Sequence, residues 1–211
     1  MRNDLYIIYR NLFSYFGPQH WWPGETPFEV AIGAILTQNT NWRNVEKAIG
    51  NLKSQGRLHP LKMHNMPVSS LASLIRPAGY FNTKARRLKN FLDLLFGQYR
   101  GSLNNMKKED PGAMRKKLLK VNGIGPETAD SIILYALEKP VFVIDAYTKR
   151  VLSRHNIIAH DVSYDEFQEL FHSGLRREVK LFNEYHALFV RVGKEFCRTK
   201  PLCAGCPLKG M

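Results

Sequence analysis

Cysteine, acidic residues and long apolar runs are all scarce in this chain of 211 residues. The three cysteines lie together between Cys197 and Cys206, so they do not make a disulfide framework and favour a reducing, intracellular compartment. The longest apolar runs, such as 132–137, fall far short of the roughly 20 residues that span a bilayer. The start of the chain includes Asp4, where a signal peptide would be purely basic. We therefore expect a cytoplasmic protein with no membrane segment.

The shortage of acidic residues leaves a strong positive charge. Lysine and arginine number 31 against 18 for aspartate and glutamate, which gives a net charge of +13. An excess of that size on a small globule favours polyanionic partners, with nucleic acid ahead of an anionic membrane. A chain that lysine merely keeps soluble is the plainer alternative. Basic residues gather in two stretches, one with Lys84, Arg86, Arg87 and Lys89, the other with Lys107, Lys108, Arg115, Lys116, Lys117 and Lys120.

The alternation of apolar and polar residues that marks a half-buried strand is also missing. Only the short apolar run 141–144 differs, and we expect it to be a buried connector. Helix signals predominate, with capping boxes at 26–29 and 163–166 and further helix caps at Asn82 and Asp110. The sequence therefore predicts an all-α protein of about ten helices joined by short turns.

A turn with two glycines joins two of the expected helices. Gly123 and Gly125 allow backbone angles and close approaches that other residues do not. Pro126 then fixes the first turn of the following helix, where outward N–H groups at a positive helix end can bind phosphate without reading sequence. A simple corner between two helices is the alternative. The lysine-rich stretch before the turn favours the phosphate-binding interpretation.

Two segments, 119–129 and 141–151, together resemble the helix-hairpin-helix DNA glycosylase superfamily that includes endonuclease III. This resemblance implies an all-α fold of two lobes with a cleft for DNA and base between them. Residues 25–139 would form a six-helix lobe with the hairpin motif at about 115–135. Residues 1–24 and 140–211 would form the second lobe. The implied DNA contacts are Gln38, Asn39, Lys120, Gly123, Ile124, Gly125, Glu127 and Thr128.

The same resemblance makes Asp145 the catalytic residue. Cleavage of a base–sugar bond builds positive charge on the deoxyribose, which an ionised carboxylate near C1′ would stabilise while it orients or deprotonates water. A helix cap is the other role open to Asp145, and the two are compatible. Bifunctional relatives have a Schiff-base lysine at the position of Glu127, so the resemblance implies a monofunctional glycosylase. Asp130 and Glu127 are rival carboxylates, and we expect Asp130 on a helix surface.

The amino-terminal half offers residues for extrusion of a base. An amide following the apolar helix, Asn39 with Gln38 beside it, would fill the gap in the DNA. Segments 21–23, 33–40 and 76–85 resemble the 3-methyladenine DNA glycosylase III branch, whose members remove alkylated purines. A cationic base binds aromatic faces, so Trp21 and Trp42, with Pro23, would form the pocket. A core role for the tryptophans is the alternative.

The carboxyl-terminal cysteines resemble the iron–sulfur loop of many endonuclease III relatives. Cys197, Cys203 and Cys206 would be three of the four ligands of a [4Fe–4S] cluster, and the fourth would fall at about position 212. Loss of the cluster, a non-cysteine ligand or zinc on three thiolates are alternatives.

We therefore expect a monomeric DNA N-glycosylase of base excision repair that acts on double-stranded DNA containing a damaged, alkylated base. Its DNA binding would associate it with the nucleoid. Two alternatives stay open at this point. One is an endonuclease III-like enzyme for uracil, mismatched thymine or oxidised bases. The other is a non-catalytic helix-hairpin-helix protein that only binds DNA.

Overall fold

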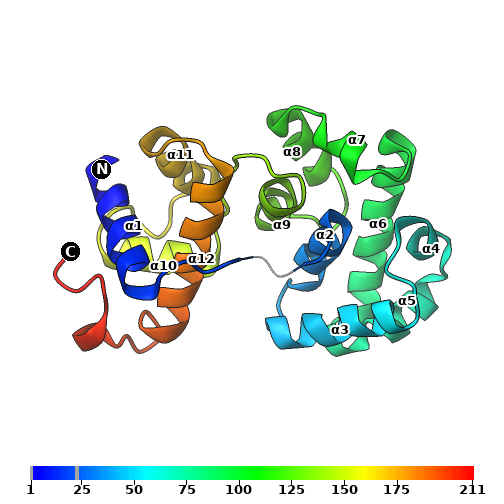
Figure 1. Ribbon diagram of the computed structural model, residues 1–211, viewed down its shortest axis with the longest axis horizontal. Helices are drawn as coiled ribbons and strands as arrows, with labels where there is room; N and C mark the ends of the chain where they lie inside the picture. Colours follow the sequence, from blue (N-terminus) through cyan, green and yellow to red (C-terminus); the bar gives the residue numbers. More distant parts are fainter. Residues whose placement is uncertain (1, 22–23) are drawn as a thin grey trace. The chain divides into compact units, whose positions relative to one another are not determined.

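The computed structural model describes residues 2–21 and 24–211, and all regular secondary structure in these residues is helical. The expectation of an all-α protein is therefore confirmed (Figure 1). None of the described helices has the length and apolar character needed to cross a membrane. Pro23, one of the expected pocket residues, lies outside the described residues.

Contacts divide the chain into two units, which we call the continuous unit (Pro23–Lys139) and the split unit (Met1–Trp22 with Pro140–Met211). In the continuous unit, α2 is buried along nearly its whole length and contacts α3, α6 and α9. A helix that is apolar on all sides belongs in a core, and α2 is the centre of this unit. The helices are α2 (Pro27–Leu36), α3 (Trp42–Ser54), α4 (Pro60–Asn65), α5 (Val68–Leu74), α6 (Phe81–Tyr99), α7 (Leu103–Lys107), α8 (Pro111–Leu119) and α9 (Pro126–Ser131), with short helical segments at Arg76–Ala78 and Ile132–Ala136.

The split unit has an aromatic core between α1 (Arg2–Phe16), α10 (Ala146–Arg154), α11 (Tyr164–Gly174) and α12 (Val179–Glu195). The rings of Phe142 and Phe171 stack with centroids 3.6 Å apart, and Tyr185 meets both edge-on. The buried Tyr185 hydroxyl donates to the Leu5 carbonyl oxygen at 2.8 Å. This bond satisfies the polar end of the ring, so the amino-terminal helix packs against α12 without leaving a buried hydroxyl unpaired.

The helix starts follow the sequence signals with two exceptions. The capping box at Ser163 and the cap at Asp110 are confirmed. Thr26 accepts the Glu29 N–H as expected, but the Glu29 carboxylate pairs with Lys53 at 2.9 Å. The expected cap at Asn82 is wrong, because the turn before α6 ends at residue 80 and Asn82 falls inside the first turn of the helix.

Candidate active site

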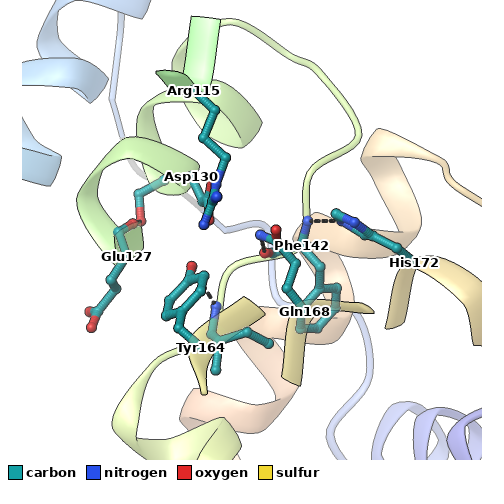
Figure 2. Close-up of polar contacts among 9 residues, drawn as sticks. Arg115, Glu127, Asp130, Phe142, Tyr164, Gln168 and His172 are labelled. Atoms are coloured by element: carbon teal, nitrogen blue, oxygen red, sulfur yellow. Dashed lines mark hydrogen bonds and ion pairs between the residues drawn. The ribbon is translucent and has the colours of Figure 1, made fainter. Parts of the chain in front are cut away.

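The segment 141–144 positions Asp145 at the start of α10. It is buried but has no strand beside it, so its backbone needs other hydrogen-bond partners. One face of α11 supplies them (Figure 2). The bonds run from the Phe142 N–H to His172 Nε2 (2.9 Å), from Gln168 Nε2 to the Phe142 carbonyl oxygen (2.7 Å) and from the Ile144 N–H to the Tyr164 hydroxyl (3.2 Å). The expected buried connector is confirmed, and these bonds fix the point at which Asp145 enters its helix.

Asp145 is the N-cap of α10, and only 8% of the residue is exposed. Its Oδ1 accepts the Thr148 N–H at 2.7 Å. Its Oδ2 lies 3.6 Å from Nε2 of His186, which comes from the middle of α12. The cap role is therefore confirmed, and both carboxylate oxygens have a fixed neighbour within the split unit.

The surroundings of Asp145 favour its ionised form. Burial by itself raises the pKa of this carboxyl group, but the charge of the neighbouring His186 and the hydrogen bond from the Thr148 N–H outweigh it and lower the pKa below the ordinary aspartate value. Asp145 is therefore an anion at neutral pH although it is almost fully buried. Such a group can stabilise positive charge that develops on a neighbouring molecule.

The glycine-rich turn lies between α8 and α9. Gly123 has φ of 90°, a left-handed angle that favours glycine, and Pro126 occupies the first turn of α9 as expected. Ile124 and Thr128 are buried, while Lys120, Gly125 and Glu127 are exposed. Gly125, the N-cap residue of α9, has no side chain and so makes no side-chain cap bond.

Gln38 holds this turn from the loop after α2. Its Nε2 donates to the Gly123 carbonyl oxygen at 3.0 Å and to Thr128 Oγ1 at 2.9 Å, and its Oε1 accepts from Arg87. Gln38 thus bonds to the hairpin through its amide nitrogen and to α6 through its amide oxygen. Asn39, beside it, is exposed and has φ of 52°. Of the two amides expected to fill the gap in DNA, Asn39 is the one whose exposure suits that role, which stays a prediction.

Substitution of Gly123 by alanine should destabilise the continuous unit by about 1–2 kcal/mol. An added Cβ would come within 2.3 Å of Cγ of Arg87, and the positive φ would strain any other side chain. Chemical denaturation measures the loss. The control is Gly97→Ala in α6, where a Cβ meets no atom within 4 Å and helix propensity predicts unchanged or higher stability. Equal stability of Gly123→Ala and wild type would contradict this account of the turn.

A buried ion pair joins the two helices of the hairpin. Asp130 of α9 is fully buried, and Nε of Arg115 in α8 donates to its Oδ1 at 2.8 Å (Figure 2). The expectation that Asp130 lies on a helix surface is therefore wrong. The short helix α9 turns this carboxylate inward, where a guanidinium compensates the cost of burying the charge.

Several residues of the two basic stretches also make internal contacts. Lys84 is buried, and its Nζ donates to the carbonyl oxygens of Leu36 (2.9 Å) and Ala78 (2.7 Å). Burial and the charge of Arg87 lower the pKa of Lys84 to about 8. Lys89 donates to carbonyl oxygens near the end of α4, and Lys117 pairs with Glu109 at 2.6 Å. The exposed members of the two stretches are Arg86, Lys107, Lys108, Lys116 and Lys120.

The two tryptophans of the expected pocket belong to different units. Trp21 is half-buried in the split unit, with Nζ of Lys194 5.9 Å from its ring centroid. Trp42 begins α3 in the continuous unit, and its Nε1 donates to Glu46 at 2.8 Å. Both rings are partly exposed, as a base-binding surface requires. Their pairing around a base stays a prediction.

The three cysteines line one cavity of about 340 Å³ in the split unit, together with Arg154 and His155. Nη1 of Arg154 donates to Cys197 Sγ at 3.4 Å. In residues 2–21 and 24–211, however, no group of three or more His, Cys, Asp or Glu side chains is arranged to hold a metal ion. A [4Fe–4S] cluster needs four ligands, of which Cys197, Cys203 and Cys206 would be three, so the cluster stays a prediction.

Comparison with known proteins places this geometry in a family. The model of the HhH-GPD superfamily base excision DNA repair proteins matches residues 32–177, which include the hairpin and Asp145. A DNA repair glycosylase of Methanocaldococcus jannaschii, so described by its name, is 49% identical over 207 residues, covering 97% of this chain and 94% of the relative.

Two solved structures have the same fold. The H. pylori 3-methyladenine DNA glycosylase, bound to 1,N6-ethenoadenine, is 30% identical with a TM-score of 0.78, covering 92% of this chain and 97% of its own. A trapped endonuclease III–DNA covalent intermediate has a TM-score of 0.84 at 22% identity. The match covers 99% of this chain and 93% of the endonuclease III chain. The family match spans most of the chain, and the fold agrees with it. The chain belongs to the HhH-GPD superfamily of base excision DNA repair proteins.

Proposed function

We propose that this protein is a monofunctional DNA glycosylase that hydrolyses the N-glycosidic bond of an alkylated base, of the 3-methyladenine type, in double-stranded DNA. The observation that supports it most is Asp145, a nearly buried carboxylate that His186 and Thr148 keep ionised within the segment matched to the family. An anion of this kind suits a reaction that builds positive charge on a sugar.

In this proposal Asp145 acts on the deoxyribose and on water. As the bond from C1′ to the base lengthens, the sugar becomes cationic and the negative carboxylate stabilises it. The same carboxylate orients the water that attacks C1′ and accepts its proton. A 3-methylated adenine in DNA is already cationic and leaves as a neutral base, so the step needs no further proton donor for this lesion.

The identity of residue 127 is the argument for an enzyme that hydrolyses the base–sugar bond without cleaving the strand. The family resemblance aligns this position with the lysine of bifunctional enzymes, and Glu127 has a carboxylate there, exposed at the start of α9. A carboxylate cannot form a Schiff base with the sugar. The endonuclease III of the solved complex was trapped as a covalent intermediate with DNA, and we expect no such adduct here.

The choice of an alkylated base has two supports. The H. pylori relative is named for 3-methyladenine and was solved with 1,N6-ethenoadenine, a modified adenine. The half-buried Trp21 offers an aromatic ring to a base. Aromatic faces attract cationic bases more strongly than neutral ones.

The test is release of free base from duplexes that each contain one lesion. The panel holds 3-methyladenine, 1,N6-ethenoadenine, uracil, thymine opposite guanine and 8-oxoguanine, and chromatography identifies each released base. We expect release of the alkylated adenines, an intact strand until the abasic site is cleaved by alkali, and no adduct after borohydride reduction. Preferential release of uracil, thymine or 8-oxoguanine would overturn the proposed choice of substrate. A covalent adduct would overturn the proposal that the enzyme is monofunctional.

A further inference from the structure

A histidine occupies the middle of α12, where the helix is otherwise apolar on its inner face. His186 is 5% exposed, and its chain neighbours Tyr185, Ala187 and Leu188 are all buried. Burial of an imidazole costs free energy unless the ring meets a polar or charged partner. An aliphatic residue would fill the same place without that cost, so packing alone does not explain the histidine.

The ring faces the carboxylate of Asp145. Nε2 of His186 lies 3.6 Å from Oδ2, while the Thr148 N–H holds Oδ1 at 2.7 Å. The two contacts act on different oxygens, so the carboxylate is restrained from two sides. All three residues belong to the split unit, and the geometry therefore does not depend on the other unit.

We propose that His186 is a positioning residue for Asp145, which it holds in one orientation and keeps negatively charged for the reaction. This inference rests on the proposed function, since it gives Asp145 the catalytic role. Burial favours the neutral carboxylic acid, which cannot stabilise a cationic sugar. His186 lies in the core beside Asp145 and counteracts the effect of burial on its pKa. Asp145 can therefore be both shielded from water and ionised.

The other charged groups near the start of α10 have contacts elsewhere. Nζ of Lys149 lies 5.0 Å from the centroid of the Phe167 ring, and Nε of Arg150 donates to the Cys197 carbonyl oxygen at 2.6 Å. On α11, the Tyr164 hydroxyl accepts the Ile144 N–H. Of the groups on α10, α11 and α12, His186 is the titratable one whose charge and hydrogen bond lower the pKa of Asp145.

The test compares His186→Leu and His186→Gln with wild type. Single-turnover rates of base release are measured from pH 3 to pH 9 on whichever duplex of the panel wild type cleaves. In wild type the rate should fall only when Asp145 becomes protonated. Loss of the imidazole in His186→Leu should shift this acidic fall upward by about one pH unit or more and lower the rate at pH 7 at least about tenfold. His186→Gln retains an N–H near Oδ2 and should recover part of the rate.

A second measurement does not need activity. The side-chain carboxyl of Asp145, observed by carbon NMR, should titrate at higher pH in both variants than in wild type. The control is His160→Gln, which changes an exposed histidine and should alter neither the rate nor the titration. Thermal melting shows that each variant is folded.

The outcomes separate the two proposals. If wild type releases no base from any duplex while the carboxyl titration still shifts, the proposed function fails and the pairing of His186 with Asp145 stands. If wild type is active but His186→Leu has the wild-type rate and acidic fall, the positioning role fails and the proposed function stands. An unchanged carboxyl titration in folded His186→Leu also overturns the inference.

Discussion

Asp145→Asn is expected to lower the single-turnover rate of base release by about 10³-fold or more while the protein keeps its fold and its affinity for duplex DNA. Asparagine is as good an N-cap as aspartate, so the Thr148 N–H keeps its acceptor and α10 its start. The substitution removes the negative charge and replaces the oxygen that faces His186 with an amide nitrogen. A loss of rate without a loss of stability or binding would therefore measure how much the charge of Asp145 stabilises the transition state.

The matched control for this experiment is another N-cap. Asp110 accepts the N–H groups of Gly112 and Ala113 at the start of α8, and it has no place in the proposed reaction. Asp110→Asn should leave the rate within a factor of about two, since both residues cap equally well. If Asp145→Asn is as active as Asp110→Asn, the carboxylate is not the catalytic group. If both variants lose DNA binding, the chosen substitutions disturb the fold and not the chemistry.

The parts that the sequence predicted are the local ones. Helix caps such as Ser163 and Asp145 bond to N–H groups three residues away, so their pattern is visible in the chain. The buried segment 141–144 was recognisable from its apolar run. The family resemblance also implies a reacting role for Asp145, which stays a prediction.

The parts that the sequence did not predict depend on contacts between distant elements. Gln38 and Gly123 meet only because α2 packs beside the hairpin, and His186 meets Asp145 only because α12 packs beside α10. The burial of Lys84 was missed for the same reason, since its carbonyl partners include Leu36 at the end of another helix. A lysine-rich stretch looks like a solvated surface until the fold assigns each side chain a neighbour.

The second large effect is expected from the ion pair between the two helices of the hairpin. Arg115→Met is expected to destabilise the continuous unit by about 3 kcal/mol, because it removes the guanidinium that compensates the buried charge of Asp130. Methionine fills much of the space of the arginine stem, so packing changes little. Chemical denaturation gives the loss of stability, and titration with an undamaged duplex gives the accompanying loss of affinity.

The double variant Arg115→Met, Asp130→Leu separates charge from packing. If the loss arises from the carboxylate that keeps its charge without Arg115, removal of that carboxylate should restore a large part of the stability. Its affinity for DNA should then recover too, because the turn between α8 and α9 regains its position. Recovery of stability without affinity would instead assign Arg115 a direct contact with DNA. A single variant as stable as wild type would show that this ion pair does not hold the hairpin together.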